Sequence, residues 1–182
     1  MTSTHTEWQT VVDFWREAGP DRWFRKDEAF DREFRDRFMT LHLAAARREC
    51  DAWENTAYSG LALLLLLDQF PRNAFRGTGH MYATDPLARY YARRLIQAGH
   101  DAEIAAGMRV FCYLPLSHSE DRDDQRRSVA LHRPLGRPWL YHAEDHQRIV
   151  ERFGRFPHRN LLLGRDTTPE EQAFLDQGGF AG

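Results

Sequence analysis

The sequence has little of what marks secreted, metal-binding or membrane proteins. It contains two cysteines, Cys50 and Cys112, in helical patterns and without the Cys-x-x-Cys or Cys/His spacing of a metal site. Free, partly buried thiols in a reducing compartment are therefore expected. Residues 1–6 are polar and show no signal peptide. The longest apolar run, Leu61–Leu67, is too short to span a bilayer. We expect a cytoplasmic protein without a membrane partner.

The chain also lacks a charge excess and a phosphate-binding loop. Its 25 basic and 27 acidic side chains give a formal net charge of -2. Nucleic-acid-binding domains usually carry a net positive charge, so no nucleic-acid partner is expected. There is no Gly-x-Gly-x-x-Gly or Walker-type motif, and Gly77-Thr78-Gly79 is too short to enclose a phosphate. We therefore predict no cofactor and no metal.

Helical signals recur along the whole chain, whereas no strand-like alternation persists. A length of 182 residues with 42% hydrophobic residues fits one globular domain, residues 1–182. Capping patterns at Thr6, Thr84 and Thr168 mark helix starts. We predict an all-α domain of about eight helices in antiparallel pairs. The expected helices run over about residues 6–18, 27–50, 56–70, 84–98, 101–115, 119–134, 139–153 and 168–175.

Two segments share the order Phe-Pro followed by Arg and Asn. One is Phe70-Pro71-Arg72-Asn73, and the other is Phe156-Pro157-His158-Arg159-Asn160. Proline ends a helix, and the residue before it is driven towards extended geometry. Each segment is therefore expected to end a helix and to present guanidinium and amide groups at a fixed turn.

These side chains have two interpretations. Arg72, Arg76 and Arg159 could bind a carboxylate or phosphate through paired hydrogen bonds, because a guanidinium matches the geometry of both anions. Asn73 and Asn160 would then orient the ligand. In the structural alternative, which we favour, the asparagines cap helix ends and the arginines bind unpaired carbonyls.

A second polar cluster lies at a predicted helix start after Pro115. His118 and Glu120 could supply a general base or metal ligands, although the spacing matches no strong metal motif. Asp121 and Asp124 are better explained as capping residues matched to the helix dipole. Capping does not explain His118, which is the best single candidate.

Further histidines occur near the end of the chain. His142 and His146 stand four residues apart, a spacing that can hold a metal, but no third ligand is identifiable. A solvated helix face is the favoured interpretation of this pair. His158 lies inside the second Phe-Pro segment, and the sequence leaves open whether it meets His118.

Several longer motifs give the chain a family resemblance. It resembles the bacterial family of unknown function DUF924, of the tetratricopeptide-like helical superfamily. The resemblance implies a fold of helical pairs and carries no assigned activity or catalytic residues. The standard tetratricopeptide pattern with its period of about 34 residues is not present. The motifs are Asp13-Phe14-Trp15, Arg22-Trp23-Phe24, Leu67–Asn73, Phe75-Arg76-Gly77-Thr78, Tyr113–Glu120 and Arg152–Asn160.

Three functional hypotheses follow from the polar residues at helix breaks. In the first, a helical binding domain takes a small anionic or zwitterionic ligand in a pocket beside the two Phe-Pro segments. In the second, an enzyme uses the same pocket with His118 or His158 as general base, oriented by Glu120. The third is a scaffold for a protein or peptide. The candidate ligand-binding residues are Asp68, Gln69, Arg72, Asn73, Arg76, His118, Glu120, His158, Arg159 and Asn160.

Overall fold

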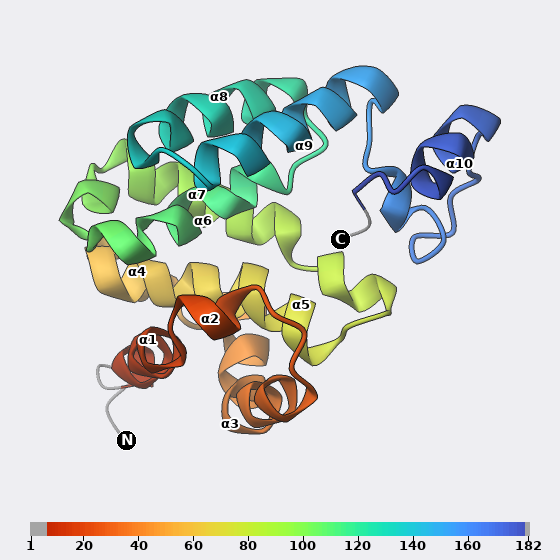
Figure 1. Ribbon diagram of the computed structural model, residues 1–182. Helices are drawn as coiled ribbons and strands as arrows, with labels where there is room; N and C mark the ends of the chain where they lie inside the picture. Colours follow the sequence, from red (N-terminus) through yellow and green to blue (C-terminus); the bar gives the residue numbers. More distant parts are fainter. Residues whose placement is uncertain (1–6, 181–182) are drawn as a thin grey trace. The chain divides into compact units, whose positions relative to one another are not determined.

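The protein is all-α, as the sequence predicts. A computed structural model describes residues 7–180 and has no strand among them; the capping box expected at Thr6 lies outside these residues (Figure 1). The α-helices are α1 (Glu7–Ala18), α2 (Pro20–Trp23), α3 (Glu28–Ala46), α4 (Ala57–Leu64), α5 (Phe70–Ala74), α6 (Asp85–Gln97), α7 (Ala106–Ser117), α8 (Arg122–His132), α9 (Trp139–Phe153) and α10 (Pro169–Asp176). The short helices are η1 (Asp51–Asn55), η2 (Leu65–Gln69), η3 (Gly79–Tyr82), η4 (His100–Glu103), η5 (Arg133–Leu135) and η6 (Pro157–Arg159); η2 is a π-helix and the others are 3-10 helices.

The chain divides into two compact units. The first comprises Met1–Arg76 and His80–Pro115, and the second comprises Gly77–Gly79 and Leu116–Gly182. Within residues 7–180, no helix has both the length and the apolar character needed to cross a bilayer.

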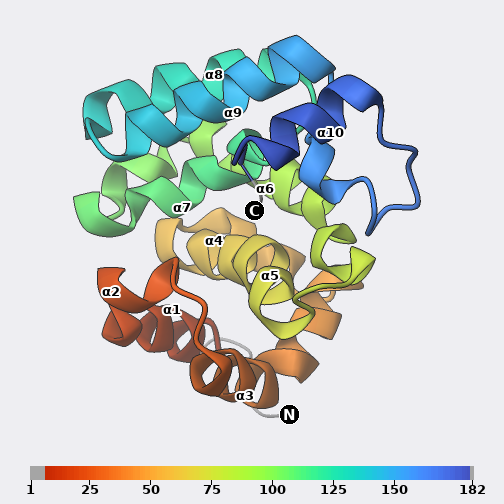
Figure 2. The same cartoon turned by 45° about the vertical axis from the view of Figure 1, so that its right-hand side comes forward.

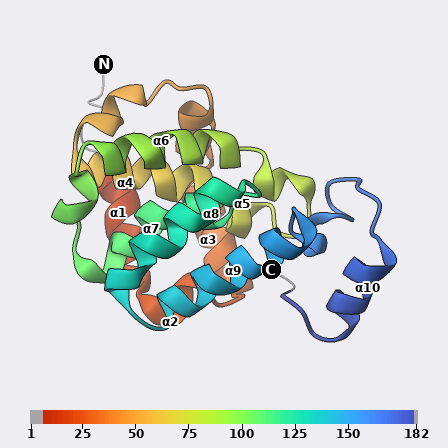
Figure 3. The same cartoon turned by 90° about the horizontal axis from the view of Figure 1, so that it is seen from above.

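Aromatic side chains form much of the core of the first unit. Phe14 of α1 packs against Phe30, Phe34 and Phe38 of α3, each with ring centroids 5.3 Å apart. The helix α4 is buried on nearly every side, because seven of its eight residues are buried. It lies beside α6 in Figure 3, and α3 contacts α5 in the view of Figure 2. The apolar run predicted to form a core helix therefore does so.

Some helix boundaries predicted from the sequence are wrong. The helix expected to reach Cys50 ends at Ala46, and Arg48 then adopts a left-handed φ of 65°. The start expected at Asp101 is only the 3-10 helix η4, whereas α7 begins at Ala106. Pro115 does not stop α7, which continues to Ser117.

The first Phe-Pro segment does not end its helix. The π-helix η2 precedes Pro71, and the chain remains helical through α5 to Ala74. Pro71 has no N–H to offer the carbonyls of the preceding turn. Side chains supply the missing donors: His42 Nδ1 bonds Leu66 O at 2.8 Å, and Thr84 Oγ1 donates to Leu67 O at 2.5 Å. The helix thus tolerates proline because its neighbours satisfy the freed carbonyls.

In the second unit, α8 and α9 pack side by side and run in opposite directions (Figure 1). The capping box predicted at Thr168 forms with Glu171 and starts α10. Gly154 ends α9 at a φ of 72°, and the second Phe-Pro segment follows as η6. An apolar cluster in this unit contains Ile149, Val150 and Phe156, with Phe153, Phe174 and Phe180 packed against it.

Candidate functional site

In the first unit, the hydrogen-bond donors of Arg72 are largely used within the protein itself. Its guanidinium binds the Asp85 carboxylate through two hydrogen bonds of 2.8 and 2.9 Å and donates to Asp68 O at 2.7 Å. Burial alone would lower the pKa of Arg72, but Asp68 and Asp85 raise it above its ordinary value. Gln69 Nε2 donates to the buried Asp68 carboxylate at 2.6 Å. These contacts favour a structural role for Arg72, because a ligand anion would have to replace Asp85.

Asn73 and Arg76 converge on a carboxylate of α3. Asn73 Nδ2 donates to Asp31 Oδ1 at 2.7 Å, and Arg76 Nε donates to Asp31 Oδ2 at 2.9 Å. Both side chains thereby tie the end of the α4–α5 segment to α3. The structure brings these residues together around Asp31, as a joint between helices.

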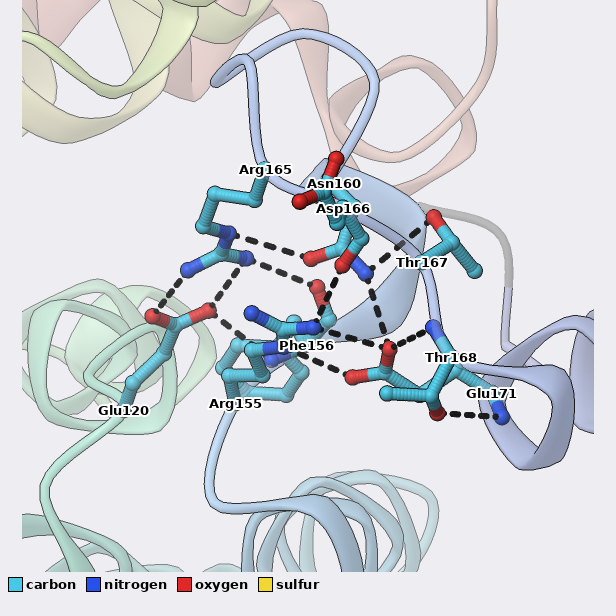
Figure 4. Close-up of polar contacts among 9 residues, drawn as sticks. All are labelled: Glu120, Arg155, Phe156, Asn160, Arg165, Asp166, Thr167, Thr168 and Glu171. Atoms are coloured by element: carbon cyan, nitrogen blue, oxygen red, sulfur yellow. Dashed lines mark hydrogen bonds and ion pairs between the residues drawn. The ribbon is translucent and has the colours of Figure 1, made fainter.

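In the second unit, Glu120 is held by Arg165. Two hydrogen bonds of 2.7 and 3.0 Å join the carboxylate to the guanidinium, and the Phe156 N–H adds a third at 2.8 Å (Figure 4). Burial tends to raise the pKa of Glu120, but these bonds lower it overall. No histidine is among the hydrogen-bond partners of Glu120 within the described part of the chain. Glu120 therefore does not orient His118 or His158, as the enzyme hypothesis required.

Asn160 belongs to the same network and is fully buried. It accepts from Arg165 Nε at 3.0 Å and donates to Glu171 at 3.2 Å. Arg155 binds Glu171 at 2.7 and 2.9 Å and lowers the pKa of that carboxyl to about 2. Figure 4 shows how these contacts fasten the segment after α9 to the start of α10. The Asn160 side chain therefore links these segments, and the expectation that it caps a helix end is wrong.

Histidine side chains from separate segments gather beside this network. We define the histidine cluster as His118, His146, His158 and Arg159. The rings of His118 and His146 have centroids 6.3 Å apart. His146 and His158 both contact Phe156, at 5.4 and 5.7 Å, and both contact Phe180, at 4.7 and 5.1 Å.

The electrostatic environment of His146 is positive. Burial, together with the smaller effect of the charges of His118, Arg159, His158 and His142, lowers the pKa of this imidazole to about 2. Its Nδ1 atom is buried and has no hydrogen-bond partner among the described residues. His146 is therefore neutral near pH 7 and keeps one ring nitrogen available for a further contact.

Arg159 completes the cluster from η6. Only 7% of the residue is exposed, and its guanidinium lies over the Phe156 ring, 4.4 Å from the centroid. Such stacking restricts the planar group, which makes it suited to bind a carboxylate or phosphate.

Sequence reasoning missed His146. The i, i+4 spacing with His142 was visible, but the favoured solvated face is wrong for His146, because Phe156 and Phe180 cover it. His142, on the same helix, is exposed as expected. Periodicity alone could not show which of the two histidines the remote aromatic residues would cover.

Metal-binding groups and hollows give no separate support for a site. Among residues 7–180, no group of three or more His, Cys, Asp or Glu side chains is placed to hold a metal ion. A hollow of about 390 Å³ lies in the first unit, and none of the candidate ligand-binding residues predicted from the sequence lines it. Its lining residues are Trp8, Gln9, Val12, Asp13, Arg16 and Tyr58.

Fold and motifs define a class of all-α proteins with polar residues concentrated at helix breaks. The chain belongs to the family of bacterial proteins of unknown function DUF924, which matches residues 11–179. It is also similar to the solved structure of a protein of unknown function from Agrobacterium tumefaciens. That similarity has 59% sequence identity and a TM-score of 0.95, and it covers 97% of this chain and 100% of the other. No curated protein matches the chain.

Proposed function

We propose that the protein binds a small anionic or zwitterionic ligand at the histidine cluster. The observation that supports this most is the gathering of three imidazoles and one guanidinium, with a buried ring nitrogen of His146 that has no hydrogen-bond partner among the described residues. Burial is the main cause of the low pKa of His146, and the neighbouring positive charges that add to it would stabilise a negative group placed among them. The proposal includes a cytoplasmic location and a tetratricopeptide-like arrangement of helical pairs.

The polar residues of the first unit are weaker candidates for this role. Asp85 already neutralises Arg72, and Asp31 already neutralises Arg76. These ion pairs join α5 to α6 and the segment after α5 to α3, which is a structural role. Asp68, Gln69 and Asn73 are interpreted as parts of those helix joints. Catalysis and recognition of a protein or peptide remain predictions from the sequence.

Thermal unfolding in the presence of ligands tests the proposal. The midpoint is measured with phosphate, sulfate, small carboxylates, nucleotides and divalent metals. A ligand at about a hundred times its Kd adds about 2.7 kcal/mol of stability. For a chain of this size, that corresponds to a rise of roughly 5–10 °C.

Two variants locate any effect. His118→Ala removes one imidazole of the cluster, whereas His100→Ala removes an imidazole of the first unit that pairs with Glu103. We expect the rise with anions to disappear in His118→Ala and to persist in His100→Ala. An equal rise in both variants would place binding elsewhere and contradict the proposal.

A further inference from the structure

Gln125 of α8 holds the backbone on both sides of His118. Its Nε2 atom donates to Ser117 O at 2.7 Å and to Ser119 O at 2.6 Å. An amide nitrogen carries two hydrogens, so both are used on the carbonyls that flank this single histidine. Gln125 is fully buried. The side chain thus clamps the segment between α7 and α8 at the position of His118.

Other buried polar groups of α8 strengthen the clamp. Asp124 accepts from Ser119 Oγ at 2.8 Å, and Ser128 Oγ lies 2.6 Å from Ser117 Oγ. These side chains are at most 3% exposed. Because buried hydrogen-bond networks restrict a backbone to one arrangement, this network limits how the His118 segment can move.

The amide oxygen of Gln125 indicates that packing between helices alone does not explain why a glutamine occupies this position. This Oε1 atom is buried and has no hydrogen-bond partner in the described part of the protein. Leaving a buried acceptor unsatisfied carries a desolvation cost that an apolar side chain of similar length would avoid. The gain must therefore come from the two Nε2 bonds that fix the flanking carbonyls.

We infer that Gln125 is a positioning residue for the histidine cluster. By fixing the carbonyls of Ser117 and Ser119, it sets the direction in which the His118 imidazole leaves the backbone and so its place beside His146. The inference rests on the proposed function only for its effect on ligand affinity. The effect on the His118 ring is independent of any ligand.

The test compares Gln125→Met with Gln172→Met. In both variants methionine keeps the length of the side chain and removes the amide donors, but Gln172 lies exposed in α10, donates to Asp176 Oδ1 at 2.8 Å and takes no part in the clamp. Urea unfolding identifies the folded variants, and long-range proton–nitrogen NMR spectra report the environment of each imidazole. The phosphate Kd is measured on the same samples.

We expect Gln125→Met to shift or broaden the His118 ring signals and to raise the phosphate Kd at least about tenfold, roughly 1.4 kcal/mol. Gln172→Met should change neither. An unchanged His118 ring in folded Gln125→Met would overturn the inference. If wild-type protein does not bind phosphate, the proposed anion site fails for this probe while the His118 signals still decide the role of Gln125. If Gln125→Met does not fold, Gln125→Glu provides the same comparison.

Discussion

The His146 imidazole carries the largest lowering of pKa described for a histidine of this protein. Its ordinary value of 6.5 applies to the unfolded chain, and burial lowers the pKa to about 2 in the folded protein. Below pH 6.5 the unfolded state therefore binds a proton that the folded state excludes. The free energy of unfolding must fall as the pH falls from 6.5 towards 2.

A non-titrating residue at position 146 should reduce this acid sensitivity. Between about pH 7.5 and about pH 5, His146 accounts for a loss of up to about 2 kcal/mol. We expect His146→Gln to lose less stability over this interval than the wild type, whatever its stability at neutral pH. Urea unfolding at both pH values measures the difference, with His100→Gln as control. Equal losses in wild type and His146→Gln would refute the pKa assignment.

At the residue level, the chemistry of single side chains selected the candidates that the structure gathers in one unit, and their role in binding stays a prediction. His118, His158 and Arg159 were selected because capping could not explain the first and because the others follow a Phe-Pro pair. The partial burial of His146 involves Phe180, which lies 34 positions further along the chain. Such a contact has no local sequence signal.

At the scale of single elements, the segment around Pro71 depends on donors from other helices. Because Pro71 has no N–H, the carbonyl oxygen of Leu67 accepts a hydrogen bond from Thr84 Oγ1 instead, a contact within the first unit. The Arg72 guanidinium donates to Asp68 O, and His42 Nδ1 forms a hydrogen bond with Leu66 O. Because the carbonyl oxygen of Leu66 only accepts, His42 Nδ1 must carry the proton. The π-helix and its proline are thus stabilised together.

Removal of the Thr84 hydroxyl should destabilise the protein, because the Leu67 carbonyl then has no side-chain donor. We expect Thr84→Val to lower the free energy of unfolding by about 1–3 kcal/mol, because Leu67 O loses its donor while partly buried. Thr10→Val is the matched control, since the Thr10 hydroxyl donates to Glu7 O in an exposed turn. The effect of Thr84→Val should be smaller in a Pro71→Ala background, which restores a backbone N–H. Identical effects in both backgrounds, measured by urea unfolding, would argue against the proposed coupling.

Some helix starts were predictable, but the start expected at Asp101 and the cap expected from the Thr84 side chain are wrong, as is the fate of Pro71. The capping residues at Asp121 and Thr168 act locally, so their patterns sufficed. Pro71 was expected to end its helix because the donors that compensate for it, from His42 and Thr84, are 29 and 13 positions away. Tertiary contacts overrode a correct local rule.

At the scale of the whole molecule, the residues expected to line one pocket are divided between the two units. Asp68, Gln69, Arg72, Asn73 and Arg76 belong to the first unit, and His118, Glu120, His158, Arg159 and Asn160 belong to the second. The sequence predicted the all-α class from helical periodicity, but it showed no boundary between these units. The expectation that the two Phe-Pro segments share a pocket stays a prediction.

Stability and ligand affinity should respond to pH in opposite directions. An anion in the histidine cluster favours the protonated form of each neighbouring imidazole and so raises its pKa. By linkage, the anion then binds more tightly as the pH falls, while the ligand-free protein becomes less stable. Calorimetric titration with sulfate, whose charge is constant from about pH 8 to about pH 6, measures the affinity. An affinity that is independent of pH would exclude the imidazoles as contacts.

An NMR titration of the histidine side chains with phosphate tests the central claim most directly. We predict that the ring signals of His118, His146 and His158 shift together, with one saturating Kd, while those of His42 and His100 in the first unit stay in place. Loss of these shifts in Arg159→Ala, with the fold retained, would identify the guanidinium as part of the same site. Signals that do not move at saturating phosphate, or that move equally in both units, would contradict an anion site at the histidine cluster.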